Sequence, residues 1–304
     1  MLNLLWEMGP CLIGGAFIGR WRPRWIAPLA TPLVRFGVPV SLMGLLLHGG
    51  LNGSLLGMAM VAVTVIAVML TLLRLATPFS AALSHPDLQL GSCIGNTAYF
   101  GIPAALALLP AEALPVSIGY DFGATLLAWG LGPLWLTRKQ ASSSQDHRWR
   151  DLLGHLSASP ATRGLVGALI VMATPWHLAI SEALWLPSRA VIVLALAVVG
   201  MRLGSIHGQG IAPEARPLQL MKPLVAKLLF YPLLLGLLAS LLQFKPLMVQ
   251  AVALQGAAPT AISLLLIAES VGADQERAAG LVFWSTLLAL ITAPVWGVLL
   301  RSQF

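Results

Sequence analysis

Apolar runs of membrane length are the feature of this sequence that most constrains its fold. A helix needs about 20 predominantly apolar residues to cross the hydrocarbon core of a bilayer. Ten stretches come close to that length: Leu2–Ile18, Ile26–Leu47, Ser54–Leu75, Leu88–Leu109, Leu114–Leu136, Gly164–Ile180, Leu184–Gly204, Leu218–Leu242, Leu247–Ile267 and Ala278–Leu300. Because the runs are continuous and not alternating, the sequence predicts an all-α integral membrane protein with ten transmembrane helices.

The composition supports this class. Hydrophobic residues make up 58% of the 304-residue chain and charged residues only 10%, and the mean hydropathy is +0.84. A chain with so little polar surface is expected to lie in a lipid bilayer.

The formal net charge of +7 would suit a nucleic-acid partner, but the placement of the charges argues against one. Most basic residues fall in alternate loops or at the ends of spans, on one side of the predicted membrane: Arg20, Arg22, Arg24, Arg74, Arg138, Lys139, Arg148, Arg150, Arg163, Arg202, Arg216, Lys222 and Arg277. The other side has Arg189, Lys245 and Arg301. Because positive loops stay in the cytoplasm, we expect a multi-pass protein of a bacterial-type cytoplasmic (inner) membrane with both termini on the outer, periplasmic side.

Two of the predicted spans contain a helix-breaking cluster near mid-depth. The first is Gly95-Asn96-Thr97-Ala98-Tyr99-Phe100-Gly101-Ile102-Pro103, and the second is Gln255-Gly256-Ala257-Ala258-Pro259-Thr260-Ala261. Paired breaks at matching positions of two halves indicate the substrate site of an inverted-repeat transporter. The alternative is that Gly and Pro are simply more frequent in membrane helices than in soluble ones.

The order of the spans predicts a 5+5 inverted repeat. The hydrophilic stretch Thr137–Thr162 separates five spans from five more, and an odd number of spans makes the second half enter the membrane from the opposite side. We therefore expect a first repeat over residues 1–138, a cytoplasmic linker over 139–162 and a second repeat over 163–304.

At these residues the chain resembles a known family. The stretch Gly95–Pro103 resembles the Gly-Asn-x-Gly-x-x-Gly-x-Pro signature of the auxin efflux carrier family, which includes bacterial malonate and malate permeases and plant PIN-type carriers. Further stretches resemble its eighth, ninth and tenth helices: Lys222-Pro223-Leu224 to Tyr231-Pro232-Leu233, Ala258-Pro259-Thr260-Ala261 with Ala268-Glu269 and Gly272-Ala273-Asp274, and Ser285-Thr286-Leu287-Leu288. Two positions depart from the pattern, Ala98 for glycine and Ser263 for asparagine.

The resemblance implies a fold related to bile-acid symporters and sodium/proton antiporters. In that fold the fourth and ninth helices are broken and cross each other. Helices 1, 2, 6 and 7 form a scaffold, with a possible homodimer, and helices 3–5 and 8–10 form a moving transport domain.

The breaks themselves predict an anion site. Free N–H groups and a partial positive charge at a mid-membrane helix start suit a carboxylate. We expect the substrate to be bound by Asn96, Thr97, Tyr99, Pro103, Gln255, Pro259, Thr260 and Ser263.

Two charged residues lie inside predicted spans, Asp121 in the fifth and Lys227 in the eighth. A charge at the bilayer centre costs about 2.5 to 3.5 kcal/mol on insertion scales, so such residues tend to pair and to serve ion or proton pathways. We interpret Asp121 as the group that takes up and releases a coupling proton, with Lys227 tuning it or pairing with it. The alternatives are a static ion pair and a Lys227 that extends to the membrane edge.

Other classes of protein fit less well. An intramembrane aspartyl protease needs two carboxylates that share a proton, and no second suitable aspartate is present. No metal-binding spacing of histidines, no cofactor motif and no cysteine-rich pattern occur, so the sequence predicts neither an enzyme nor a metal or cofactor site. A channel is a further rival, and a sensor or scaffold role fits least.

The sequence therefore predicts a secondary carrier that moves a small organic anion across the bilayer by alternating access. The substrate is a dicarboxylate such as malonate or malate, or an aromatic acid resembling auxin. The coupling ion is H⁺ in the first interpretation and sodium in the second, and uncoupled transport is the third.

Overall fold

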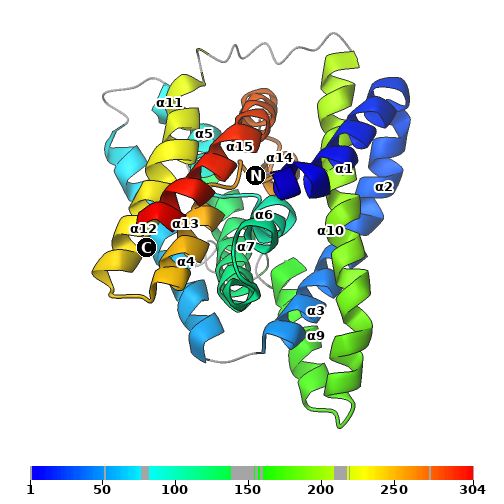
Figure 1. Cartoon of the computed structure of the whole chain (residues 1–304). Coiled ribbons are helices and arrows are strands. Elements are labelled where there is room, and N and C mark those ends of the chain that lie inside the picture. The colour runs from blue at the N-terminus through cyan, green and yellow to red at the C-terminus, as the bar shows by residue number, and fades with distance from the viewer. Residues whose placement is uncertain are drawn as a thin grey trace.

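The structure is a computed structural model of the chain (Figure 1). It describes residues 2–50, 53–76, 82–137, 154, 157, 160–208, 218, 220–273 and 275–303. Most of the predicted linker 139–162 lies outside the described residues. So do Asp274 of the ninth-helix motif and several of the basic loop residues, namely Arg138, Lys139, Arg148, Arg150 and Arg216.

The described residues are almost entirely helical. A first group of helices consists of α1 (Leu2–Trp21), α2 (Ile26–Pro32), α3 (Val38–Gly49), α9 (Pro160–Met172) and α10 (His177–Gly208). A second group consists of α4 (Gly53–Leu75), α5 (Pro86–Gly91), α6 (Ile102–Leu108), α7 (Leu114–Thr137), α11 (Met221–Val225), α12 (Tyr231–Leu241), α13 (Pro246–Gly256), α14 (Ser263–Ser270) and α15 (Glu276–Gln303). Short 3₁₀ turns occupy Pro23–Trp25, Ala82–Ser84 and Ala111–Ala113.

Several stretches are long and apolar enough to cross a membrane. In the part of the chain that the structure describes there are five: Pro23–Gly49, Leu55–Leu75, His177–Val198, Met221–Leu241 and Glu276–Arg301. The chain is therefore a multi-pass membrane protein. The predicted number of ten spans and the 5+5 repeat stay predictions.

Two neighbouring predicted spans have different limits in the structure. The sequence predicts helices over Gly164–Ile180 and Leu184–Gly204, but α9 ends at Met172 and α10 already begins at His177. Pro175 lies in the turn between them. Proline lacks the N–H that a helix interior requires, and its ring disfavours helical backbone in the preceding residue, so the helix ends before it.

The two groups of helices lie side by side (Figure 1). In the first group α1 packs along α10, and α3 packs against α9 and α10. In the second group α7 contacts α4, α13 and α14, while α12 packs against α13. The first group contains the residues of the predicted helices 1, 2, 6 and 7, and the second contains those of helices 3–5 and 8–10. The division into a scaffold and a transport domain stays a prediction. A relative motion of the two groups stays a prediction.

Glycines allow some of these helices to approach closely. A Cβ at Gly123 of α7 would collide with the backbone of Ala59 on α4, and one at Gly204 of α10 would collide with the backbone of Ala16 on α1. In a bilayer, where lipid tails are as apolar as leucine, such small-residue contacts supply helix association through close van der Waals packing.

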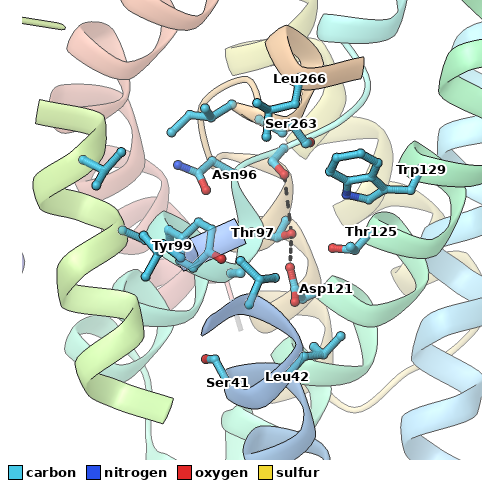
Figure 2. A pocket seen from close by; sticks show the side chains of 18 of the residues that line it. Ser41, Leu42, Asn96, Thr97, Tyr99, Asp121, Thr125, Trp129, Ser263 and Leu266 are labelled. Atoms are coloured by element: carbon cyan, nitrogen blue, oxygen red, sulfur yellow. Dashed lines mark hydrogen bonds between the residues drawn. The ribbon is translucent and has the colours of Figure 1, made fainter. Parts of the chain in front are cut away.

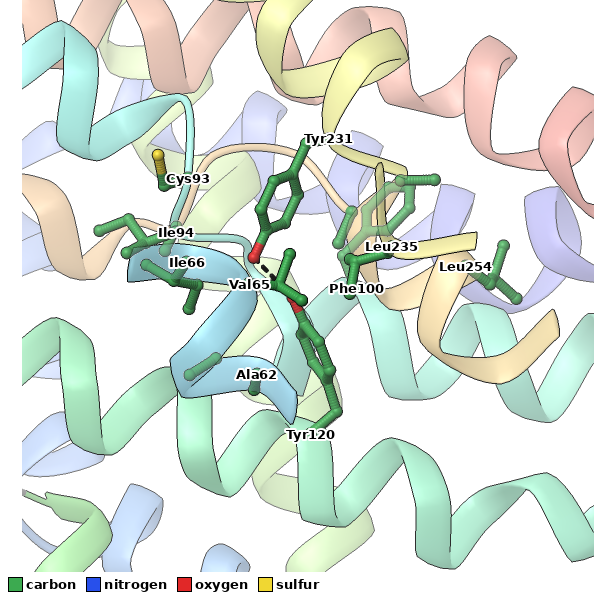
Figure 3. Close-up of a cluster of buried hydrophobic side chains, with 14 of the residues drawn as sticks. Ala62, Val65, Ile66, Cys93, Ile94, Phe100, Tyr120, Tyr231, Leu235 and Leu254 are labelled. Carbon is green, nitrogen blue, oxygen red and sulfur yellow. Dashed lines mark hydrogen bonds between the residues drawn. The ribbon is translucent and has the colours of Figure 1, made fainter. Parts of the chain in front are cut away.

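A buried tyrosine pair joins α7 to α12 inside the second group (Figure 3). The hydroxyl groups of Tyr120 and Tyr231 lie 2.7 Å apart in a hydrogen bond, surrounded by Val65, Phe100 and other apolar side chains. Both tyrosines are 1% exposed. Each hydroxyl satisfies the other, so the pair adds a polar contact to an apolar core without leaving either hydroxyl unpaired.

In the described parts of the chain three π-helical turns interrupt the helices, and each ends two residues before a proline. They are Leu33–Gly37 before Pro39, Thr97–Gly101 before Pro103, and Ala226–Phe230 before Pro232. Proline clashes with the carbonyl four residues earlier and cannot bond to it, and a wider turn relieves that clash. Two of the carbonyls that lie four residues before a proline accept hydrogen bonds from side chains instead. Trp296 Nε1 donates to Leu228 O at 2.9 Å, and Arg163 Nη1 donates to Arg35 O at 3.5 Å.

Candidate functional site

The two predicted breaks meet at the centre of the second group. Helix α5 ends at Gly91 and the next helical turn starts at Thr97, while α13 ends at Gly256 and α14 starts at Ser263. Gly95 and Thr260 form an isolated antiparallel bridge. Asn96 N donates to Pro259 O at 2.7 Å, and Ala261 N donates to Ile94 O at 3.1 Å. Backbone that is not helical at this depth must be satisfied inside the protein, and the two breaks satisfy each other.

The carboxyl ends of the two half-helices that enter the crossing are capped by side chains. Thr260 Oγ1 donates to Gly91 O at 2.9 Å, and the Lys227 ammonium donates to Gly256 O at 2.8 Å. Lys227 is fully buried, at 0% exposure. A cation at a helix carboxyl end is favourable because that end carries partial negative charge. Thr260 N in turn donates to Ser285 Oγ at 3.0 Å, so α15 supports the second break.

A cavity of about 110 Å³ lies beside the crossing, between the two groups of helices (Figure 2). On the measure that one water needs about 10 to 15 Å³, it has room for several water-sized groups. The second group contributes Gly95, Asn96, Thr97, Ala98, Tyr99, Asp121, Thr125, Trp129, Ala261, Ile262, Ser263 and Leu266 to its walls. The first group contributes Ala30, Leu33, Val38, Ser41, Leu42, Leu45, Ala195 and Val198.

Two helix starts face this cavity. The helical stretch Thr97–Leu108 begins at its wall, and α14 begins there with Ser263. The amides of Phe100 and Gly101 bond to Asn96 O, whereas those of Thr97, Ala98 and Tyr99 have no hydrogen-bond acceptor among the described residues. Unpaired N–H groups and the partial positive charge of a helix start together favour a bound anion.

Asp121 of α7 faces the same cavity. Its side chain is held by Thr97, whose Oγ1 donates to Asp121 Oδ1 at 2.5 Å (Figure 2), and Thr125 of the same helix also lines the cavity. Asp121 is 2% exposed. It forms no ion pair with Lys227 or any other cation in the described part of the chain. The Asp121 carboxyl group is therefore hydrogen-bonded to the hydroxyl of Thr97 at the helix start and has no cationic partner among the described residues.

Two polar groups of the cavity wall have no hydrogen-bond partner among the residues that the structure describes. The Tyr99 hydroxyl is buried and unpaired, and the Asn96 amide group makes no hydrogen bond with any described residue, although Asn96 is only 5% exposed. Buried polar groups are normally hydrogen-bonded. These two groups are therefore available to a ligand.

Five of the ten predicted site residues line the cavity: Asn96, Thr97, Tyr99, Ser263 and Asp121. The other five, Pro103, Gln255, Pro259, Thr260 and Lys227, do not. Gln255 is fully buried with both amide atoms unpaired, and its side chain lies against Gly101. Contact of these residues with substrate stays a prediction.

Sequence reasoning missed two residues of α7 that belong to the cavity. Thr125 and Trp129 follow Asp121 at intervals of four residues, and residues four apart lie on the same face of a helix. That spacing was the available signal. The wall supplied by α2, α3 and α10 has no such signal, because apart from Ser41 its residues are ordinary apolar ones. Within the described residues no cluster of His, Cys, Asp and Glu could hold a metal ion.

Comparison with known families adds to this geometry. The model of a family described as membrane transport protein matches residues 147–297. The match covers α9 to α14 with most of α15, and so includes the second break but not the first. No curated protein matches the chain significantly. The chain belongs to this membrane transport protein family, which is that of the auxin efflux carriers.

Proposed function

We propose that the protein is a secondary active transporter that moves a small organic anion across the cytoplasmic membrane by alternating access. The observation that carries the proposal is the meeting of two helix starts at one cavity, with free backbone N–H groups and an unpaired Tyr99 hydroxyl. Such a cavity in a membrane transporter suits a carboxylate group.

The walls favour an anion with one carboxylate and an apolar body. Apart from the polar groups around Asn96 and Asp121, the lining consists mainly of aliphatic residues with Trp129. No Lys, Arg or His is among the lining residues that the structure describes. A second carboxylate would therefore lack a cationic partner, and burying an unpaired charge is expensive. Of the predicted substrates, an aromatic acid fits this lining better than malonate or malate.

The position of the cavity supports alternating access. It lies between the two groups of helices, so a shift of one group against the other would change which side of the membrane it opens to. The predicted scaffold, the 5+5 inverted repeat, the outward termini and the possible homodimer all belong to this proposal. The antiparallel pairing of the two breaks supports the repeat.

The proposed coupling ion is a proton, and Asp121 is its carrier. A carboxyl group that faces a cavity and has only hydroxyl partners can exchange a proton with that cavity. Lys227 does not pair with Asp121 in this structure, because its ammonium donates to Gly256 O. Pairing of the two would need another conformation, whereas capping of α13 needs none.

Radiolabelled exchange in liposomes tests the proposal. The purified protein is reconstituted, and counterflow is measured for malonate, malate, other short carboxylates and indole-3-acetate. A carrier gives saturable counterflow for at least one acid, and Asn96→Ala reduces it. Flux that neither saturates nor shows counterflow would indicate a channel, and absence of flux for every acid would contradict the anion assignment.

A further inference from the structure

We infer that the Asp121 carboxylate and the carboxylate of the substrate compete for the same helix start, so that one proton binds Asp121 for each anion that enters the cavity. The inference rests on the proposed function and specifies its coupling. It fixes the stoichiometry and the relative direction of the two fluxes.

The first step is that the Asp121 carboxylate and the substrate carboxylate would lie at the same helix start. Thr97 is the first residue of the helical stretch Thr97–Leu108, and its hydroxyl is bonded to Asp121 at 2.5 Å. The unpaired amides that would receive a substrate carboxylate belong to Thr97, Ala98 and Tyr99. A carboxylate bound to these amides would therefore lie next to Asp121, within the same cavity.

The second step is that two negative charges cannot share this place. At about 4 Å, in the effective dielectric of a protein, the repulsion between two carboxylates weakens binding by about a thousandfold. The partial charge of a helix start strengthens anion binding by at most about thirtyfold. The repulsion is the larger effect, so the substrate anion binds tightly only when Asp121 carries a proton.

The third step is that no other described residue of the cavity wall can remove the negative charge. Of the residues that line the cavity, Tyr99 is the other titratable one, and its hydroxyl is a neutral donor. The walls from α2, α3, α10 and α14 contribute apolar residues and the hydroxyls of Ser41 and Ser263. Lys227, on the crossing, is committed to Gly256 O. A proton on Asp121 neutralises the carboxylate and also converts it into a hydrogen-bond donor for the substrate.

The consequence is symport. The proton stays on the Asp121 carboxyl while the anion is bound, and the two leave together. A monocarboxylate thus crosses with one proton and without net charge, whereas a dicarboxylate carries one net negative charge.

Equilibrium binding at a series of pH values tests this inference, with radiolabelled indole-3-acetate and malonate as probes. At alkaline pH the Kd of the wild type is expected to rise about tenfold per pH unit, since each bound anion requires one proton. Asp121→Asn keeps the acceptor for Thr97 but has no charge, so its Kd is expected to be low and independent of pH. Glu112→Gln, a change at an exposed carboxylate outside the cavity, should keep the wild-type slope.

A second measurement needs no variant. Mixing weakly buffered wild-type protein with either probe at alkaline pH should take up one proton per bound anion, as read by a pH indicator. Binding without proton uptake, or a pH slope that persists in Asp121→Asn, or binding that sodium restores in place of protons, would overturn the inference and leave the carrier intact. Absence of both binding and counterflow for all acids would instead overturn the proposed function.

Discussion

Thr97 Oγ1 donates a 2.5 Å hydrogen bond to Asp121 Oδ1, and this bond joins the start of a half-helix to the middle of α7. The same hydroxyl lies 3.5 Å from the carbonyl oxygen of Gly95, which forms the isolated bridge between the two breaks. The carboxyl group, the helix start and the crossing are thus connected through one side chain. A change in the charge of Asp121 would therefore act directly on the backbone that faces the cavity.

Tyr99→Phe should weaken substrate binding without affecting the empty protein. The Tyr99 hydroxyl is buried and unpaired, so its removal costs no internal hydrogen bond. A bound carboxylate that accepts from it would lose about 1 to 1.5 kcal/mol, a five- to tenfold rise in Kd. Binding of radiolabelled acids and thermal unfolding check both parts. A fall in stability with unchanged Kd would show that the hydroxyl is structural.

Two threonines with buried hydroxyl groups should respond in opposite ways to replacement by valine. Thr260→Val removes the donor for Gly91 O and leaves that carbonyl unsatisfied, which should lower the free energy of unfolding by about 1 to 3 kcal/mol. Thr292→Val removes a buried hydroxyl that has no hydrogen-bond partner among the described residues and should be neutral or slightly stabilising. Unfolding of both variants in mixed micelles is the measurement. Equal losses would contradict the capping role of Thr260.

Gly123→Ala should separate α7 from α4. The added methyl group would collide with the backbone of Ala59, which cannot move like a flexible side chain, so a loss of about 1 to 3 kcal/mol is expected. Gly57→Ala on α4 is the matched control, because a Cβ there meets nothing within 4 Å. That change should raise stability slightly through helix propensity. The difference between the two unfolding free energies tests the packing.

The tyrosine pair should behave as a coupled unit. Tyr120→Phe or Tyr231→Phe alone leaves one buried hydroxyl without its partner at 2.7 Å, whereas the double variant removes both. A double-mutant cycle of unfolding free energies should give a coupling of about 0.5 to 1.5 kcal/mol. Strict additivity of the two changes would show that water or another group replaces the missing hydroxyl.

Much of the site could be predicted because its signals are local. Proline and glycine at positions 95, 101, 103, 256 and 259 disfavour a continuous helix, and a break at that depth exposes helix ends. Asn96, Thr97, Tyr99 and Ser263 follow from lying next to those breaks, and Asp121 from its charge within an apolar run.

The remaining features depend on how distant segments are placed. The position of a residue within an apolar run indicates its depth in the membrane. The face of the helix on which a single residue lies cannot be predicted in this way. Lys227 shows this: its π turn, Ala226–Phe230, directs the ammonium to Gly256 O and not to Asp121. The π turn itself had a signal in Pro232, because a wider preceding turn relieves the clash of the proline ring with Leu228 O. The apolar wall from α3 and α10 depends on helix packing, which has no local signature.

Binding of radiolabelled indole-3-acetate and malonate to Asn96→Asp and Asn96→Ala tests the central claim most directly. The claim is that the helix starts at the crossing hold the substrate carboxylate. The Asn96 amide faces the cavity without a partner, so its loss in Asn96→Ala should weaken binding by about tenfold. Asn96→Asp has nearly the same shape but adds a negative charge, and it should abolish binding through like-charge repulsion. Binding to Asn96→Asp as tight as to the wild type would contradict the account.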